Sequence, residues 1–142
     1  MEYDLEERTA KFGEEVIKFC KTIECNNITK PLVNQFIRSS ASIGANYMEA
    51  NQASSKKDFI NKIRICQKES NESKHWARMI SVAEEDKKEK CRELWKEAHE
   101  LTLIFAKISK NCQAKENKKE KVWKLKIRIY LKIIKITKLK II

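Results

Sequence analysis

The sequence predicts an all-α protein, an antiparallel up-down-up-down bundle of four helices. The chain of 142 residues contains only two glycines and one proline, so few residues interrupt regular structure. Charged residues make up 36% and hydrophobic residues 42% of the chain, which is typical of long amphipathic helices. Apolar residues also recur at alternating steps of three and four in successive segments. We expect residues 1–113 to form the four-helix bundle and residues 114–142 to form a basic, Lys/Ile-rich C-terminal tail.

The first two helices are predicted from seams, the rows of residues that a packed helix buries. The first seam precedes a break at Cys25–Asn27 and contains Leu5, Thr9, Phe12, Val16, Phe19 and Ile23. Thr29 can cap the second helix, and Pro31 falls in its first turn, where a missing N–H costs nothing. This helix extends to about Ala53, and its seam contains Val33, Phe36, Ser40, Ile43, Tyr47 and Ala50.

The next two helices follow from the same pattern. Ser55 and Asp58 resemble a capping box, with Asp in place of the usual Glu, and predict the start of the third helix. The charged turn at 84–88 is acidic first, which favours the start of the fourth helix. The third seam contains Phe59, Ile63, Cys66, Ser70, Ser73, Ala77 and Ile80, and the fourth contains Cys91, Leu94, Ala98, Leu101, Phe105, Ile108 and Cys112.

The second helix carries two further rows beside its seam. One row is small, and we expect it to form an oligomer interface, because a helix in a monomeric bundle needs only one buried face; it contains Ala41, Gly44, Ala45 and Met48. The other row is polar and contains Arg38, Ser42, Asn46 and Glu49. We expect the polar row to face Glu69 and Glu72 in a network that fixes helix register or subunit contacts. A small-ligand pocket and simple surface pairing are the alternative interpretations.

Three motifs resemble those of one family. They are Leu5-Glu-Glu-Arg-Thr9 with Phe12, Val16 and Phe19; Arg38-Ser39-x-x-Ser42-Ile43-Gly44-Ala45-Asn46-x-x-Glu49-Ala50; and Asp58-Phe59-Ile60-x-Lys62-Ile63 followed by Lys68-Glu69-x-x-Glu72-x-x-x-Trp76. In order and spacing, about residues 3–112 resemble the small helical bundle family linked to intervening sequences in bacterial 23S rRNA genes. Departures are Ser70, where alanine is common, His75-Trp76-Ala77 in place of Tyr-Trp-Leu, and the basic tail, which has no counterpart.

The resemblance implies a left-handed antiparallel bundle that assembles into a homopentameric ring. It also implies a protein with no established enzymatic activity and an unresolved cellular role. A more distant bundle, the accessory protein of diversity-generating retroelements, forms a pentameric barrel and binds a reverse transcriptase and nucleic acid. From the family resemblance we expect an interaction or scaffold protein whose partners are other copies of this chain, and by the retroelement analogy we expect RNA or a ribonucleoprotein as a further partner.

The net charge lies in the tail. Residues 1–113 hold 20 basic and 18 acidic side chains, whereas residues 114–142 hold 11 basic and 2 acidic ones, which together give the net +11. Between Val122 and Ile142 the apolar pattern fits both a strand and a helix, so periodicity leaves both conformations open. The lysines come too often for a membrane span.

Three roles for the tail stay open at this point. Cations interleaved with aromatic rings can grip a phosphate backbone and stack on bases, and the expected nucleic-acid contacts are Lys118, Lys119, Lys121, Trp123, Lys124, Lys126, Arg128 and Tyr130. The same composition suits an anionic membrane surface. It also suits a passive extension of biased composition.

Catalytic, metal and cofactor sites are not predicted. Glu72 and His75 have the spacing of two ligands on one helix, but His99 has Lys96 three residues earlier, so half of a di-metal set is missing. No nucleophile elbow or glycine-rich phosphate loop occurs, and no small-molecule substrate is evident. The five cysteines lack a C-x-x-C pair. Without a signal peptide we expect a reducing, cytoplasmic location.

Overall fold

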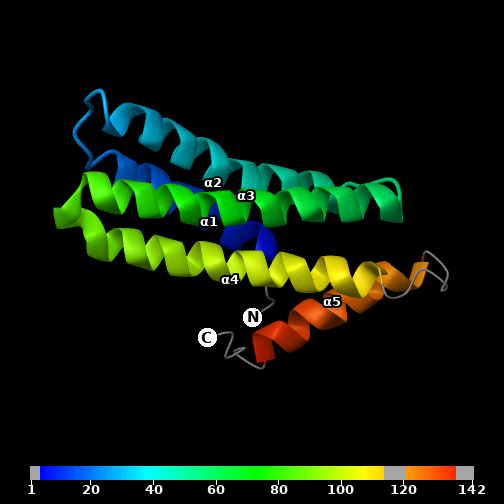
Figure 1. Ribbon diagram of the computed structural model, residues 1–142. Coiled ribbons are helices and arrows are strands. Elements are labelled where there is room, and N and C mark those ends of the chain that lie inside the picture. Colours follow the sequence, from blue (N-terminus) through cyan, green and yellow to red (C-terminus); the bar gives the residue numbers. More distant parts are fainter. Residues whose placement is uncertain (1–3, 114–120, 137–142) are drawn as a thin grey trace.

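The computed structural model describes residues 4–113 and 121–136, and within the second range it describes the side chains of residues 125–134. These residues form five α-helices and a short 3₁₀ turn and contain no strand. The elements are α1 (Leu5–Cys20), α2 (Thr29–Asn51), α3 (Lys56–Ala83), η1 (Glu85–Lys87), α4 (Lys88–Gln113) and α5 (Lys121–Ile136). Helices α1 to α4 lie alongside one another as a bundle, and α5 crosses α4 (Figure 1).

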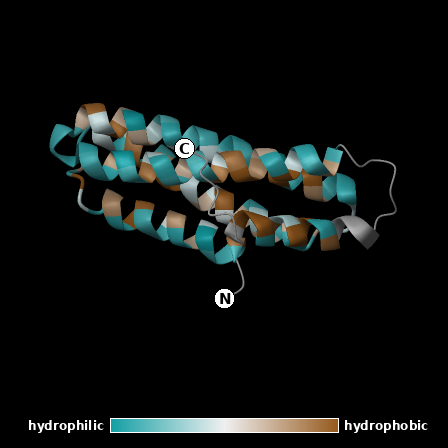
Figure 2. Cartoon of the chain, turned by 90° about the horizontal axis from the view of Figure 1, so that it is seen from below, coloured by the Kyte–Doolittle hydropathy of each residue, from teal (hydrophilic) through white to brown (hydrophobic). Residues whose placement is uncertain are grey.

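The core lies along the predicted seams. Every seam residue is buried except Ile23 and Val33, which are half-buried against it. Fully buried residues from the four bundle helices meet at the centre, and they include Val16, Phe36, Ile43, Ile63, Leu101 and Phe105. Hydrophilic and hydrophobic residues alternate along the helices (Figure 2), as expected of amphipathic helices packed through one face.

The middle of the core between α2 and α3 is small and polar. Ser39, Ser70 and Ser73 are fully buried, and the Ser39 and Ser73 hydroxyls share a hydrogen bond of 2.8 Å. Ser70 donates to the carbonyl oxygen of Cys66 over 2.7 Å. Because each hydroxyl has a partner, these serines avoid the cost of unsatisfied burial while their small size lets α2 and α3 approach closely.

Three helix ends show how side chains set the bounds. Helix α1 stops at Cys20, earlier than its seam predicted, because the N–H groups of Thr22 and Ile23 bond three residues back and tighten the turn. At the start of α2 the predicted cap by Thr29 is wrong: the Asn26 Oδ1 accepts from the N–H groups of Ile28 and Thr29. The Ser55 cap of α3 is confirmed, since its hydroxyl accepts from the Asp58 N–H over 3.1 Å.

Residues 121–136 are helical, which decides between the two conformations that periodicity left open. Ile127, Tyr130, Leu131 and Ile134 share one helical face, and all four pack against the bundle core. A helix satisfies its own backbone, whereas a strand would need a neighbouring strand. Within residues 4–113 and 121–136, none of the helices combines the length and apolar content that crossing a membrane requires.

Candidate functional site

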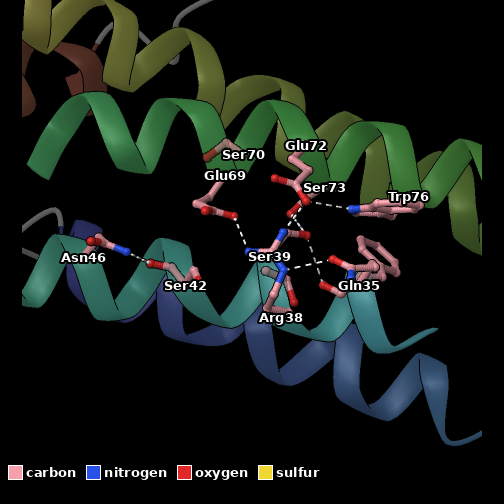
Figure 3. A network of polar contacts seen from close by, with 12 residues as sticks. Gln35, Arg38, Ser39, Ser42, Asn46, Glu69, Ser70, Glu72, Ser73 and Trp76 are labelled. Atoms are coloured by element: carbon pink, nitrogen blue, oxygen red, sulfur yellow. Dashed lines mark hydrogen bonds and ion pairs between the residues drawn. The ribbon is translucent and has the colours of Figure 1, made fainter. Parts of the chain in front are cut away.

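A polar network joins α2 to α3 at the middle of the bundle (Figure 3). The Arg38 guanidinium donates from Nη1 to Glu69 Oε2 over 3.2 Å and from Nη2 to Glu72 Oε1. Its Nε donates to Gln35 Oε1 over 2.9 Å. Trp76 Nε1 donates to the same Glu72 oxygen over 3.1 Å. One guanidinium therefore holds two carboxylates of the neighbouring helix, and an indole supports the second.

The electrostatics of this network depend on its unequal exposure. The Arg38 side chain is 45% exposed, whereas those of Glu69 and Glu72 are 13% and 28% exposed. Burial raises the pKa of Glu72, but hydrogen bonds from Trp76 and Arg38 outweigh burial and hold that pKa below its ordinary value. Burial likewise opposes the charge on Arg38, and the two carboxylates still raise its pKa. Both partners stay ionised near neutral pH.

Three predicted members of the network lie elsewhere. Asn46 Nδ2 donates to the backbone oxygen of Ser42 over 2.8 Å, within α2 (Figure 3). Glu49 pairs with Lys62 of α3. Glu49 follows Arg38 by eleven residues, about 16 Å along a helix, so it meets a different part of α3.

The small row of α2 divides between two surroundings. A Cβ built on Gly44 would lie in ordinary van der Waals contact with Thr9 and Ala10 of α1, at 3.6–3.7 Å, so Gly44 faces α1 inside the chain. Gly13 of α1 faces Ser40 and Ala41 in the same way. The side chains of Ala41, Ala45 and Met48 are exposed. Of the four residues of the small row, these three are the exposed ones.

Sequence reasoning missed a second arginine network, which joins α1 to α4. Arg8 Nε donates to Glu97 Oε1 over 2.7 Å, and its Nη2 bonds Glu97 and Glu100. Arg8 belongs to the first family-like motif, and Glu97 and Glu100 share a helix face. The three-residue spacing of Glu97 and Glu100 was a sequence signal for a pair of carboxylates. Nothing in the sequence indicated that they contact Arg8, because Arg8 and Glu97 are 89 positions apart.

Only some of the predicted nucleic-acid contacts lie among the side chains that the structure describes. Lys118 and Lys119 lie outside the described residues, as do the side chains of Lys121, Trp123 and Lys124. Arg128 is exposed on α5 and Lys126 is half-buried. Tyr130 is partly buried and packs against the core, and burial raises the pKa of its hydroxyl despite a hydrogen bond with Asn111.

Helix α5 also presents an exposed apolar ridge, which we define as Leu125, Ile129 and Ile133. Their exposed fractions are 58%, 49% and 48%. The cations Arg128 and Lys132 are exposed beside this ridge. The exposed side of α5 is therefore both basic and apolar.

Metal ligands do not cluster in the part of the chain that the structure describes. Among its His, Cys, Asp and Glu residues, no group of three or more could hold a metal ion. The His75 ring packs edge-on against Trp76, with centroids 4.9 Å apart.

Comparison with known proteins adds two findings. The family described as 23S rRNA-intervening sequence protein matches residues 1–105. A crystal structure of a protein with unknown function from the S23 ribosomal protein family of Bacteroides thetaiotaomicron is 28% identical, with a TM-score of 0.66. The match covers 75% of this chain and 99% of that chain. A search of curated proteins gave no match.

Proposed function

The chain belongs to the 23S rRNA-intervening sequence protein family, and from this premise we propose that it is a non-enzymatic, self-assembling scaffold for RNA or a ribonucleoprotein. In this proposal the bundle is antiparallel, copies of it form a pentameric ring in the cytoplasm, and α5 supplies the contact to RNA. The charge of α5 is the observation that carries the proposal.

Six cations and no carboxylate occur between residues 121 and 136, at Lys121, Lys124, Lys126, Arg128, Lys132 and Lys135. Because α5 packs through its Ile134 face, exposed Arg128 and Lys132 are held on the outside of the bundle. Cations fixed in this way bind phosphates without a large loss of conformational entropy. A ring of copies would place several such helices on one RNA and add avidity.

The test uses the full chain and two triple variants with the same charge change. The first, Lys126→Gln with Arg128→Gln and Lys132→Gln, removes cations of α5. The matched control, Lys57→Gln with Arg64→Gln and Lys68→Gln, removes exposed cations of α3. The probes are a 23S rRNA transcript that carries an intervening sequence and an unrelated transcript of equal length.

We expect the α5 variant to weaken binding to RNA and to lower the slope of log K against log salt by roughly 2, since each lost phosphate contact removes about 0.7. The α3 variant should keep the wild-type slope. Equal losses in both variants would show that only total charge matters, and no loss in either would contradict a role of α5.

The ridge favours a second candidate, binding to an anionic membrane surface. Leu125, Ile129 and Ile133 could enter the headgroup layer while Arg128 and Lys132 contact lipid phosphates. Replacing the three apolar residues by Ser keeps the charge. Sedimentation with vesicles of phosphatidylserine and phosphatidylcholine should then decrease, whereas RNA binding should persist. If wild-type protein does not sediment with such vesicles, the membrane candidate is wrong.

A further inference from the structure

A small cleft between α3 and α4, near the η1 turn, has a composition unlike the rest of the bundle. Its volume is about 140 Å³, and it is lined by Ala77, Arg78, Ser81, Lys88, Cys91, Arg92 and Trp95. Three of these residues are cations, and no carboxylate is among them. We call this the Trp95 cleft.

One wall of the cleft is the indole ring of Trp95, which is supported by neighbouring side chains. Trp95 is 38% exposed and stacks on His99, with centroids 5.1 Å apart and planes 16° from parallel. Lys74 Nζ lies 5.6 Å from the Trp95 ring centroid and 3.4 Å from His99 Nδ1. His99 lies one turn after Trp95, whereas Lys88, Cys91 and Arg92 precede it. The ring is therefore supported by His99 and Lys74 and is also part of the lining of the cleft.

A larger groove between α1 and α4 offers a contrast. Its volume is about 540 Å³, and its lining includes five carboxylates (Asp4, Glu7, Glu15, Glu93 and Glu97) against three cations (Arg8, Lys11 and Lys90). Several of these charges pair with one another, as Arg8 does with Glu97. An excess of carboxylates repels phosphate, so of these two hollows only the Trp95 cleft suits a polyanion.

We propose that the Trp95 cleft binds single-stranded nucleic acid. One base stacks against the cleft side of Trp95, and the flanking phosphates contact Arg78, Lys88 and Arg92. Base stacking on an aromatic ring inside a cationic groove is how single strands are bound without sequence preference. Duplexes keep their bases paired and offer no free face to the ring.

Two further features fit this ligand. The cleft is smaller than the roughly 300–1,000 Å³ of pockets that enclose a small molecule, so it suits one unit of a polymer that runs over the surface. Arg92 pairs with Glu89, whose side chain is 80% exposed, and such a pair exchanges for a phosphate at little cost. The Cys91 thiol carries no charge near neutral pH, because burial raises its pKa to about 11.

The inference shares with the proposed function only the assumption that the partner is nucleic acid. It uses residues of α3 and α4, whereas the proposed function uses α5. The two can therefore fail separately.

The experiment measures binding of fluorescent 12-nucleotide single-stranded RNA to the full chain carrying Lys126→Gln, Arg128→Gln and Lys132→Gln, which halves the number of cations on α5 and lowers its contribution. In that background, Trp95→Leu should weaken binding roughly 5- to 150-fold, the value of one stacked base, and Trp95→Phe should recover most of it. Arg78→Gln with Arg92→Gln should weaken binding, whereas the matched pair Lys57→Gln with Arg64→Gln should not.

Unchanged affinity in Trp95→Leu, or equal affinity for double- and single-stranded RNA, would overturn the inference. A 12-nucleotide strand that is abasic at every position offers no base to stack, so it should bind the α5 triple variant with the same affinity whether residue 95 is Trp or Leu. If Trp95→Leu weakens binding while the α5 triple variant binds like wild type, the cleft stands and the assignment to α5 fails. If the α5 variant loses all binding and Trp95→Leu with intact α5 binds normally, the reverse holds.

Discussion

At the scale of single residues, burial decides which charged and reactive groups matter. Arg38 is close to half exposed, but the Glu69 it holds is nearly buried. An exposed ion pair contributes about 0–1 kcal/mol, whereas a buried carboxylate that loses its partner costs more. The value of Arg38 therefore lies in the carboxylates that would otherwise be unpaired.

Replacing Arg38 by Gln should lower the free energy of unfolding by roughly 1–2 kcal/mol near pH 7. The pKa of Glu72 is lowered in the folded protein, so its contribution is present above the unfolded value, about 4.3, and is lost as the pH falls through the folded value. The difference between wild type and variant should thus shrink as the pH falls through the folded pKa of Glu72. Urea unfolding at equal protein concentration measures the free energy of unfolding of wild type and variant at each pH, and Arg64→Gln, at an exposed arginine, is the control. A difference that does not depend on pH would contradict the role of Glu72.

The cysteines make a second prediction at this scale. Cys25 is exposed, whereas Cys20, Cys66, Cys91 and Cys112 are buried. Burial raises the pKa of Cys20 and Cys66 to about 12, so these thiols do not form the reactive thiolate near neutral pH.

A maleimide should therefore modify one thiol of the native protein quickly and all five only after unfolding. Mass spectrometry of the labelled peptides gives the site, and Cys25→Ser should abolish the fast phase. Rapid native labelling at Cys66 would show that the α2–α3 core opens readily.

At the scale of helices, what the sequence predicted well was local. The buried rows of each helix follow from the helical period alone. The period therefore predicts that Ser70 is buried without any knowledge of the helix against which it packs. Long-range facts were missed, because pairs such as Arg8 with Glu97 or Lys74 with Trp95 depend on the register of two helices. Glu49 was assigned to the wrong partner for the same reason. The helical period predicted that Gly44 lies on a second packed face of its helix. It could not predict whether that face packs against α1 or against a neighbouring subunit.

Helix α5 offers a direct test of its packing, because it carries matched isoleucines. Ile134 is 5% exposed and Ile129 is 49% exposed. Ile134→Ala should lower the docking free energy of α5 by about 2 kcal/mol, whereas Ile129→Ala should have little effect. Hydrogen exchange of the α5 amides measures this, and Ile134→Ala should speed their exchange without affecting α2. Equal exchange in both variants would contradict the docking of α5 through its Ile134 face.

At the scale of the whole molecule, the small row of α2 and the basic side of α5 are exposed surfaces outside the core. The exposed part of the small row, Ala41, Ala45 and Met48, is apolar, which suits contact with another copy of the chain. The basic side of α5 suits a polyanion. Residues 1–113 carry a net +2 and residues 114–142 a net +9, so copies joined through their bundles would not have to bring their most basic segments together.

Assembly through the small row can be tested with one charge placed on it. Met48 is 55% exposed on α2 and Val82 is 73% exposed on α3, so neither residue is needed in the core. Met48→Glu should lower the molar mass measured by light scattering, because a subunit contact would have to bury an unpaired carboxylate. Val82→Glu adds the same charge elsewhere and should leave the mass unchanged. Circular dichroism should show full helicity in both variants. If Met48→Glu keeps the wild-type mass, the small row is not the assembly surface, and the ridge of α5 becomes the next surface to test.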